Sequence, residues 1–111
     1  MSEKDKINIL SILEAIQKIF SYSGHYSSAD EFYENQRDFD AAMMNFMVVG
    51  EMVARLSDEF IEKHNHIEWQ KIRGFRNIIA HNYFGIDAEE VWEIINIYLP
   101  KFRNELKAII K

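Results

Sequence analysis

Four side chains that could carry chemistry lie close together in the largely apolar segment 73–85, "RGFRNIIAHNYFG". They are Arg76, Asn77, His81 and Tyr83, which supply a guanidinium, a carboxamide, an imidazole and a phenol. An imidazole, with an ordinary pKa of about 6.5, can take up and release a proton near neutral pH. A guanidinium keeps its charge and offers forked donors to anionic oxygens. Together these groups could carry acid–base chemistry beside a fixed positive charge.

The spacing of the four groups predicts where they lie on a helix. At about 3.6 residues per turn, Arg76 and Tyr83 nearly eclipse each other, and Asn77 and His81 are neighbours one turn apart. Arg76 and His81 differ in direction by about 140°. One helix therefore presents two adjoining polar strips. Both strips could line the same cleft if two such helices packed side by side. The alternative is an ordinary helix end with a solvated arginine and a buried histidine.

Helical periodicity dominates the rest of the chain. Apolar residues recur at steps of three and four residues over about 3–23, 38–63 and 87–109, which is typical of amphipathic helices. A short helix is predicted over 28–35, and a helix over 67–83 carries the four polar groups. No segment alternates with period two. We expect a single all-α domain that spans the 111 residues, an up-and-down bundle of four to five helices.

Three residues of these helices should shape the packing. Gly50 costs a helix about 1 kcal/mol relative to Ala, which predicts a close crossing by another helix. Pro100 should kink or split the last helix near Leu99. Glu51 is expected to pair with Arg55 one turn on, or to take part in a site at a subunit interface. The 14% aromatic content and the five Met residues provide apolar surface for such an interface.

The charge distribution limits the partners that the surface can bind. The net charge of −5 argues against binding nucleic acid over the whole surface. Between residues 63 and 84, however, four Lys or Arg residues stand against a single acid, so the four polar groups lie in a basic segment. The sequence contains no Cys, which excludes disulfides and thiolate chemistry. The longest apolar runs have four residues, so we expect a cytoplasmic protein with no membrane span.

A metal site is suggested by one pattern only, the pair His64 and His66 with Glu62 and Glu68 nearby in the sequence. In a turn the geometry of these side chains is unconstrained, and their spacing specifies no third ligand. We therefore expect a solvated turn and no metal ion.

The segment "RNIIAHNY" resembles the R-x4-H-x-Y motif of HepT-type proteins of the HEPN superfamily. Arg76, His81 and Tyr83 match the three motif positions, and Asn77 holds the polar position that commonly follows the arginine. The resemblance continues through "VVGEMVARLSDEF", "HNHIEWQKIRGFRNIIAHNYFGID" and "VWEIINIYLP", so it covers about residues 38–110. No motif position departs from the pattern.

This resemblance implies a HEPN-like bundle that forms a homodimer, with both copies of the motif facing one cleft. It also implies a metal-independent ribonuclease that is the toxin of a toxin–antitoxin pair, with tRNA or mRNA as its RNA target. Arg76 would bind the phosphate and stabilise the transition state, and His81 would act as general acid and base. Asn77 would orient either group, while Arg73 and Lys71 are candidates for RNA binding.

The resemblance further implies a partner, a minimal nucleotidyltransferase that acts as the antitoxin. This enzyme would use ATP and Mg²⁺ to transfer AMP to Tyr83, making the toxin a phosphoprotein, whereas the chain itself would need no cofactor. AMP would add bulk and negative charge to the cleft and so oppose RNA binding. The simpler interpretation of Tyr83 is a helix-end tyrosine packed on Ile79 and Phe84.

Two other functions remain open at this stage. The chain could be a non-catalytic dimeric module that docks a nucleotidyltransferase or binds a nucleotide, and the acidic net charge favours this alternative. It could also be a purely structural helical dimer. A neighbouring gene for a small nucleotidyltransferase with a G-S-x10-D-x-D motif would favour the toxin–antitoxin interpretation.

Overall fold

The computed structural model of the chain describes the backbone of residues 1–111 and every side chain except that of Asn82. Its elements are, in order, α1 (Glu3–Ser23), α2 (Ala29–Glu34), α3 (Gln36–Ala54), α4 (Asp58–Lys63), α5 (Trp69–Asn82), η1 (Tyr83–Gly85), α6 (Ala88–Glu93), η2 (Ile94–Tyr98) and α7 (Leu99–Ile109). The η1 segment is a 3₁₀ turn, and η2 is a π-helical segment. No strand occurs in the described part of the chain, and the prediction of an all-α fold is confirmed.

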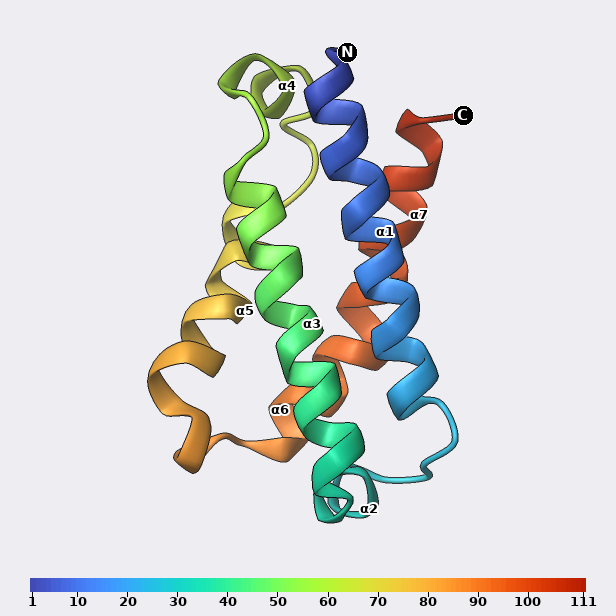
Figure 1. Cartoon of the computed structure of the whole chain (residues 1–111), viewed down its shortest axis with the longest axis vertical. Helices are drawn as coiled ribbons and strands as arrows, with labels where there is room; N and C mark the ends of the chain where they lie inside the picture. The colour runs from blue at the N-terminus through green and yellow to red at the C-terminus, as the bar shows by residue number, and fades with distance from the viewer.

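The long helix α3 lies between α1 and α5 and packs against both of them (Figure 1). The helix α7 packs on α1, and α6 packs on α2. Both chain ends and α4 lie at one end of the molecule, while α2 and the η1 segment lie toward the other. Among the described residues, no helix has the length and the apolar content needed to cross a membrane.

The core lies where α3 meets its two neighbours. Its buried apolar side chains are Phe39, Met43, Phe46, Val49 and Val53 from α3, Ile9, Ile12, Ile16 and Ile19 from α1, and Ile72, Phe75 and Ile79 from α5. Burying a side chain of this size stabilises the fold by about 1.5–3 kcal/mol. The apolar arc of α3 is wide because two helices cover this helix. On α5, the face opposite the buried residues carries polar groups.

The prediction of one continuous helix over residues 38–63 is wrong at residues 55–57, where the helix is interrupted. α3 ends at Ala54, and the short helix α4 begins after Ser57. The Ser57 side chain accepts a hydrogen bond from the backbone N–H of Phe60, which caps α4. The backbone N–H and hydroxyl of Ser57 donate to the buried carboxylate of Asp5, at 2.9 and 2.6 Å. This contact with α1 fixes the turn between α3 and α4.

Pro100 splits the last helix at Leu99, as predicted, but the chain stays helical through the split. The π-helical segment Ile94–Tyr98 directly precedes α7, and Pro100 lies in the first turn of α7. Proline has no N–H to donate and crowds the carbonyl one turn before it. The wider π turn directly before α7 accommodates both effects.

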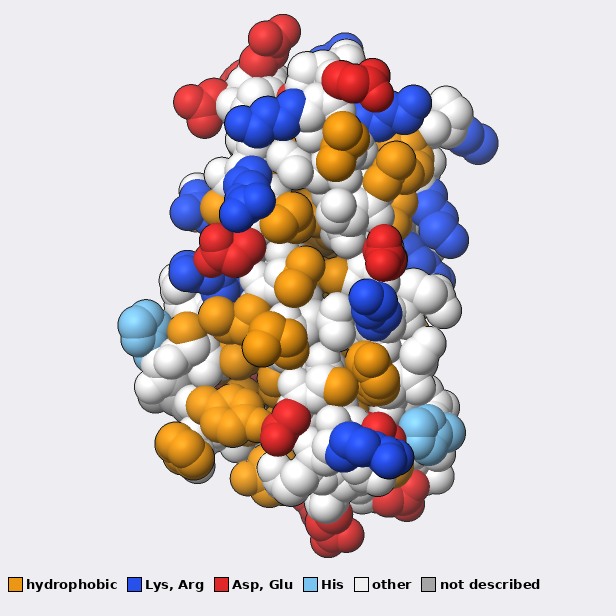
Figure 2. All heavy atoms as spheres, viewed as in Figure 1, with side chains coloured by type: hydrophobic (Ala, Val, Ile, Leu, Met, Phe, Trp, Pro, Cys, Tyr) orange, Lys and Arg blue, Asp and Glu red, His pale blue; other side chains and the backbone are white. Residues whose placement is uncertain are grey.

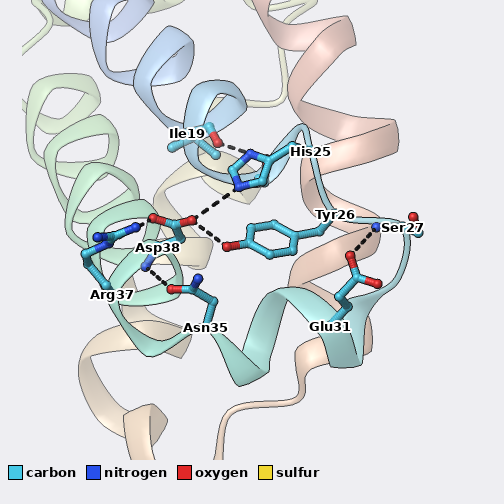
Figure 3. A network of polar contacts seen from close by, with 9 residues as sticks. Ile19, His25, Tyr26, Ser27, Glu31, Asn35, Arg37 and Asp38 are labelled. Atoms are coloured by element: carbon cyan, nitrogen blue, oxygen red, sulfur yellow. Dashed lines mark hydrogen bonds and ion pairs between the residues drawn. The ribbon is translucent and has the colours of Figure 1, made fainter.

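A polar network fixes the start of α3 (Figure 3). Oδ2 of the buried Asp38 accepts a hydrogen bond from the Tyr26 hydroxyl at 2.5 Å and lies 3.4 Å from His25 Nε2. Its other oxygen, Oδ1, lies 3.6 Å from Arg37 Nε. The hydrogen bond lowers the pKa of Asp38 and raises the pKa of Tyr26 to about 12. The network therefore ties the loop between α1 and α2 to the first turn of α3.

Candidate functional site

The helix α5 carries Asn77 and His81 of the sequence motif on the side that faces away from its buried residues. Because Ile72, Phe75 and Ile79 are buried at helical spacing, Asn77 and His81 are left exposed. The alternative of a buried histidine is therefore wrong. An exposed imidazole at this position is open to a ligand or to another subunit.

Gly50 marks a close crossing of α3 and α5, as predicted. A β-carbon added to Gly50 would lie 2.6 Å from Cβ and 3.0 Å from Cδ of Arg76. The aliphatic part of the Arg76 side chain therefore lies directly on the backbone of α3. Glycine at this position sets the depth at which the motif arginine sits.

Gly50→Ala is expected to lower the free energy of unfolding by about 1–3 kcal/mol, because the added methyl group forces Arg76 and α5 away from α3. Gly74 is the matched control, since a β-carbon there meets nothing within 4 Å. Gly74→Ala should be neutral or stabilise the protein by up to about 1 kcal/mol, the ordinary gain for a helical position. Urea denaturation of the two variants measures the difference. Equal stabilities would contradict the close crossing.

Glu51 pairs with Arg76 of α5, and the prediction that it pairs with Arg55 is wrong. Arg76 Nε lies 2.7 Å from Glu51 Oε1, and the two side chains are 41% and 45% exposed. Arg76 Nε makes no hydrogen bond of good geometry within the described residues, so the contact is an ion pair. At this exposure such a pair adds little to stability. The ion pair instead orients the Arg76 guanidinium, because Glu51 contacts one edge of this group.

A hollow of about 180 Å³ lies beside this ion pair. Its lining residues are Gly50 and Ala54 from α3 and Gln70, Arg73, Gly74, Arg76 and Asn77 from α5. The two glycines and the alanine leave the space open, and four of the lining residues carry guanidinium or carboxamide groups, which are hydrogen-bond donors. Such a set of donors suits a phosphate group. His81 is not among the lining residues, so one chain alone does not bring it into the hollow.

Lys71 and the paired histidines lie away from this hollow. Lys71 Nζ lies 3.7 Å from the centre of the Tyr98 ring and 4.0 Å from Glu68 Oε2. The rings of His64 and His66 are 6.2 Å apart. Among the described residues, no three His, Cys, Asp or Glu side chains are grouped so that they could hold a metal ion. Of the two predicted RNA-binding cations, only Arg73 is next to the motif arginine.

Tyr83 begins the η1 segment and is anchored to α3. Its hydroxyl donates a hydrogen bond to Oδ1 of Asp40. This hydrogen bond, with partial burial and the charge of Asp40, raises the pKa of Tyr83 to about 12. The ring meets Phe84 edge-on at 5.7 Å, and Phe84 is 97% exposed. The predicted contact with Phe84 is present, but the contact with α3 is the one that fixes the phenol.

Asp40 is a residue of this site that the sequence analysis missed. A signal was present in the spacing. Asp40 and Glu51 are eleven residues apart, which places them about 20° apart on a helix, three turns from each other. Arg76 and Tyr83 would be near-eclipsed in a continuous helix, although α5 ends at Asn82 and Tyr83 begins η1. Two acids on one face of α3 thus contact two motif residues, one on α5 and one on η1.

Comparison with known proteins gives consistent matches over the whole chain. The family description "Ribonuclease HepT-like" matches residues 12–109. A protein of Methanocaldococcus jannaschii named "Gamma-glutamylcyclotransferase and putative RNase" is 32% identical over 111 residues, which is all of this chain and 50% of that protein. The chain therefore spans half the length of this relative.

Two further relatives match over nearly their full length. A "Putative RNase" of the same organism is 30% identical over 112 residues, covering all of this chain and 92% of that protein. A "Probable ribonuclease HepT" of Thermococcus cleftensis is 22% identical over 111 residues, all of both chains. No solved structure matches the chain significantly.

Proposed function

The chain belongs to the HepT-like ribonuclease family, and we propose that it cleaves RNA without a metal ion, with Arg76 and His81 as the catalytic residues. One observation carries this proposal. Arg76, held at the Gly50 crossing, lines a hollow together with Arg73 and Asn77. This is a concentration of phosphate-binding donors on a chain whose net charge is −5.

The residue types define the reaction. His81 accepts the proton of an RNA 2′-hydroxyl, and the 2′-oxygen attacks the adjacent phosphorus. The bond from phosphorus to the 5′-oxygen breaks, and the leaving oxygen takes a proton from a protonated imidazole. Arg76 stabilises the negative charge that develops on the phosphoryl oxygens. The product is a 2′,3′-cyclic phosphate, which water can open to a 3′-phosphate.

The proposed active form is a homodimer. Arg76 and His81 differ in direction by about 140° on one helix, so a second copy is needed to close a cleft around both strips. Exposed apolar side chains near the motif include Met44, at 64%, and Phe84, at 97%. Figure 2 shows hydrophobic side chains gathered over α3 and α5 on this face. Sedimentation at micromolar concentration should show a dimer, and a monomer would contradict this arrangement.

We further propose that the chain is the toxin of a toxin–antitoxin pair. Its partner is a minimal nucleotidyltransferase that silences it by transferring AMP from ATP to Tyr83. The position of Tyr83 supports this, because the η1 segment lies at the end of α5, beside the exposed Phe84. An enzyme can reach the phenol there, two residues beyond His81.

RNA cleavage by the purified chain is expected to persist in excess EDTA, because the proposed chemistry needs no metal. A labelled single-stranded RNA and total cellular RNA serve as substrates, and the product ends are identified by treatment with phosphatase and by mass spectrometry. Terminal 2′,3′-cyclic phosphate or 3′-phosphate is expected. Activity that is lost in EDTA and restored by Mg²⁺ or Mn²⁺ would overturn the mechanism. RNA binding without any cleavage would favour the non-catalytic module instead.

A further inference from the structure

The contact between Asp40 and Tyr83 joins a motif residue to a residue outside the motif. Asp40 lies on α3, 43 residues before Tyr83 in the sequence, and its Oδ1 accepts the hydrogen bond of the phenol. Both Asp40 and Glu51 project from one face of α3, and Glu51 engages the other motif residue, Arg76. The carboxylate of Asp40 is exposed at its solvent side, so a ligand can approach it.

We propose that Asp40 orients the Tyr83 phenol and accepts its proton when the hydroxyl is adenylylated. This inference rests on the proposed silencing by a nucleotidyltransferase. In this proposal a residue of the toxin itself, in addition to those of its partner, takes part in the transfer of AMP. Asp40 contacts the reacting hydroxyl, so its role is that of a general base.

The transfer step balances with Asp40 as the proton acceptor. Tyr83 Oη forms a bond to the α-phosphorus of ATP, and the bond from this phosphorus to the oxygen bridging to the β-phosphorus breaks. Pyrophosphate leaves with that electron pair. The phenol proton passes to Oδ1 of Asp40, the atom that already accepts its hydrogen bond. Mg²⁺ bound with ATP by the partner neutralises charge on the phosphates.

A base is needed because the phenol is not ionised at neutral pH. An unperturbed phenol has a pKa of about 10, and the pKa of Tyr83 is raised to about 12 by its hydrogen bond to Asp40. The neutral oxygen is a weak nucleophile. Its proton becomes acidic only as the bond to phosphorus forms, and a carboxylate already in hydrogen-bond contact can take it at that moment.

The modification also ends the contact that anchors Tyr83. The ester oxygen of adenylylated Tyr83 has no proton to donate to Asp40. Its phosphate carries a negative charge close to the carboxylate, and like charges at this distance repel. AMP addition therefore releases the Tyr83–Gly85 segment from α3 beside the catalytic helix.

The test compares Asp40→Asn with the control Asp58→Asn. Asparagine keeps an oxygen that accepts a hydrogen bond but carries no charge to take a proton. Asp58 is an exposed acid in the first turn of α4, at the opposite end of the molecule from the η1 segment (Figure 1). Each variant is incubated with its cognate nucleotidyltransferase and labelled ATP, and AMP incorporation into the Tyr83 peptide is followed over time.

Asp40→Asn is expected to lower the rate of adenylylation by about 100-fold or more, the usual contribution of a general base. The loss should fall on kcat and leave KM for ATP near the wild-type value. The difference in rate between the wild type and Asp40→Asn should become smaller as the pH rises toward the pKa of Tyr83, because a phenolate needs no base. The groups that act on this pKa are Asp40 of α3 and Tyr33 of α2. Asp58→Asn should match the wild type.

A second measurement tests the contact without the partner enzyme. Tyrosine labelled with ¹³C at Cζ reports the ionisation of each phenol by NMR, and Tyr83→Phe identifies the Tyr83 signal. The pKa of Tyr83 should fall from about 12 in the wild type toward its ordinary value in Asp40→Asn. An unchanged titration would show that Asp40 does not hold the phenol, and the proposal would be overturned.

The failure of this proposal is distinct from the failure of the proposed function. If wild type and Asp40→Asn are adenylylated at equal rates, silencing stands and the role of Asp40 is wrong. If the wild type is not adenylylated by an active partner, both the silencing and the proton-acceptor role are wrong. RNA cleavage by the free chain is judged separately, since it requires neither ATP nor the partner.

Discussion

Replacing His81 with alanine is expected to lower the rate of RNA cleavage by about 10²–10⁴-fold, the usual contribution of a general acid or base. The imidazole is exposed at the end of α5, so its removal leaves the core intact. The free energy of unfolding should stay within about 0.5 kcal/mol of the wild type, as for other surface substitutions. Cleavage of a labelled RNA by the purified variant measures the effect, and expression of the chain without its partner should no longer arrest growth.

His66→Ala is the matched control, because it removes an exposed imidazole from the turn before α5. It should cleave RNA at the wild-type rate. Arg76→Ala should also be inactive, but it removes the side chain packed on Gly50 and the partner of Glu51, so its stability needs to be measured in parallel. Full activity of His81→Ala in a folded dimer would rule out the proposed acid–base role.

The features that the sequence predicted correctly depend on interactions close along the chain. The helices follow from apolar residues at steps of three and four. Gly50 predicted a close crossing because its cost inside a helix needs a compensating contact, and the Arg76 side chain lies at that position. Pro100 predicted the split at Leu99 for a similarly local reason. The motif residues were singled out by their types and spacing and by their resemblance to the R-x4-H-x-Y motif, and their catalytic roles stay predictions.

The features that were missed depend on contacts between distant residues. The end of α3 is fixed by Asp5, which is 52 residues from Ser57 in the sequence. Glu51 has a suitable local partner in Arg55, but the fold brings Arg76 closer. Helical periodicity predicts the direction in which a side chain projects from its own helix. It does not predict which side chain of another helix it contacts. The pairing of α3 with α5 was needed to find Asp40 as the partner of Tyr83.

Tyr83→Phe is expected to abolish silencing while RNA cleavage continues. The phenyl ring keeps the stacking surface, which is worth about 1–3 kcal/mol per base. It has no oxygen to accept AMP, so adduct formation at this position should fall to zero. The lost hydrogen bond to Asp40 costs about 0.5–1.5 kcal/mol, which the rest of α5 can tolerate. Cells that express the variant together with the active nucleotidyltransferase should stop growing, whereas cells with the wild-type pair should grow.

Tyr33→Phe is the control for AMP addition to a tyrosine other than Tyr83. Tyr33 is 38% exposed, and it affects the pKa of Tyr83. This variant should still be silenced and should carry the same adduct as the wild type. Mass spectrometry of the co-expressed protein should find AMP on the peptide with Tyr83 only. If Tyr83→Phe remained silenced by an active partner and the wild type carried no adduct, silencing would have to act by binding alone. The Asp40–Tyr83 hydrogen bond would then be a structural link between α3 and the end of α5, with no part in the transfer of AMP.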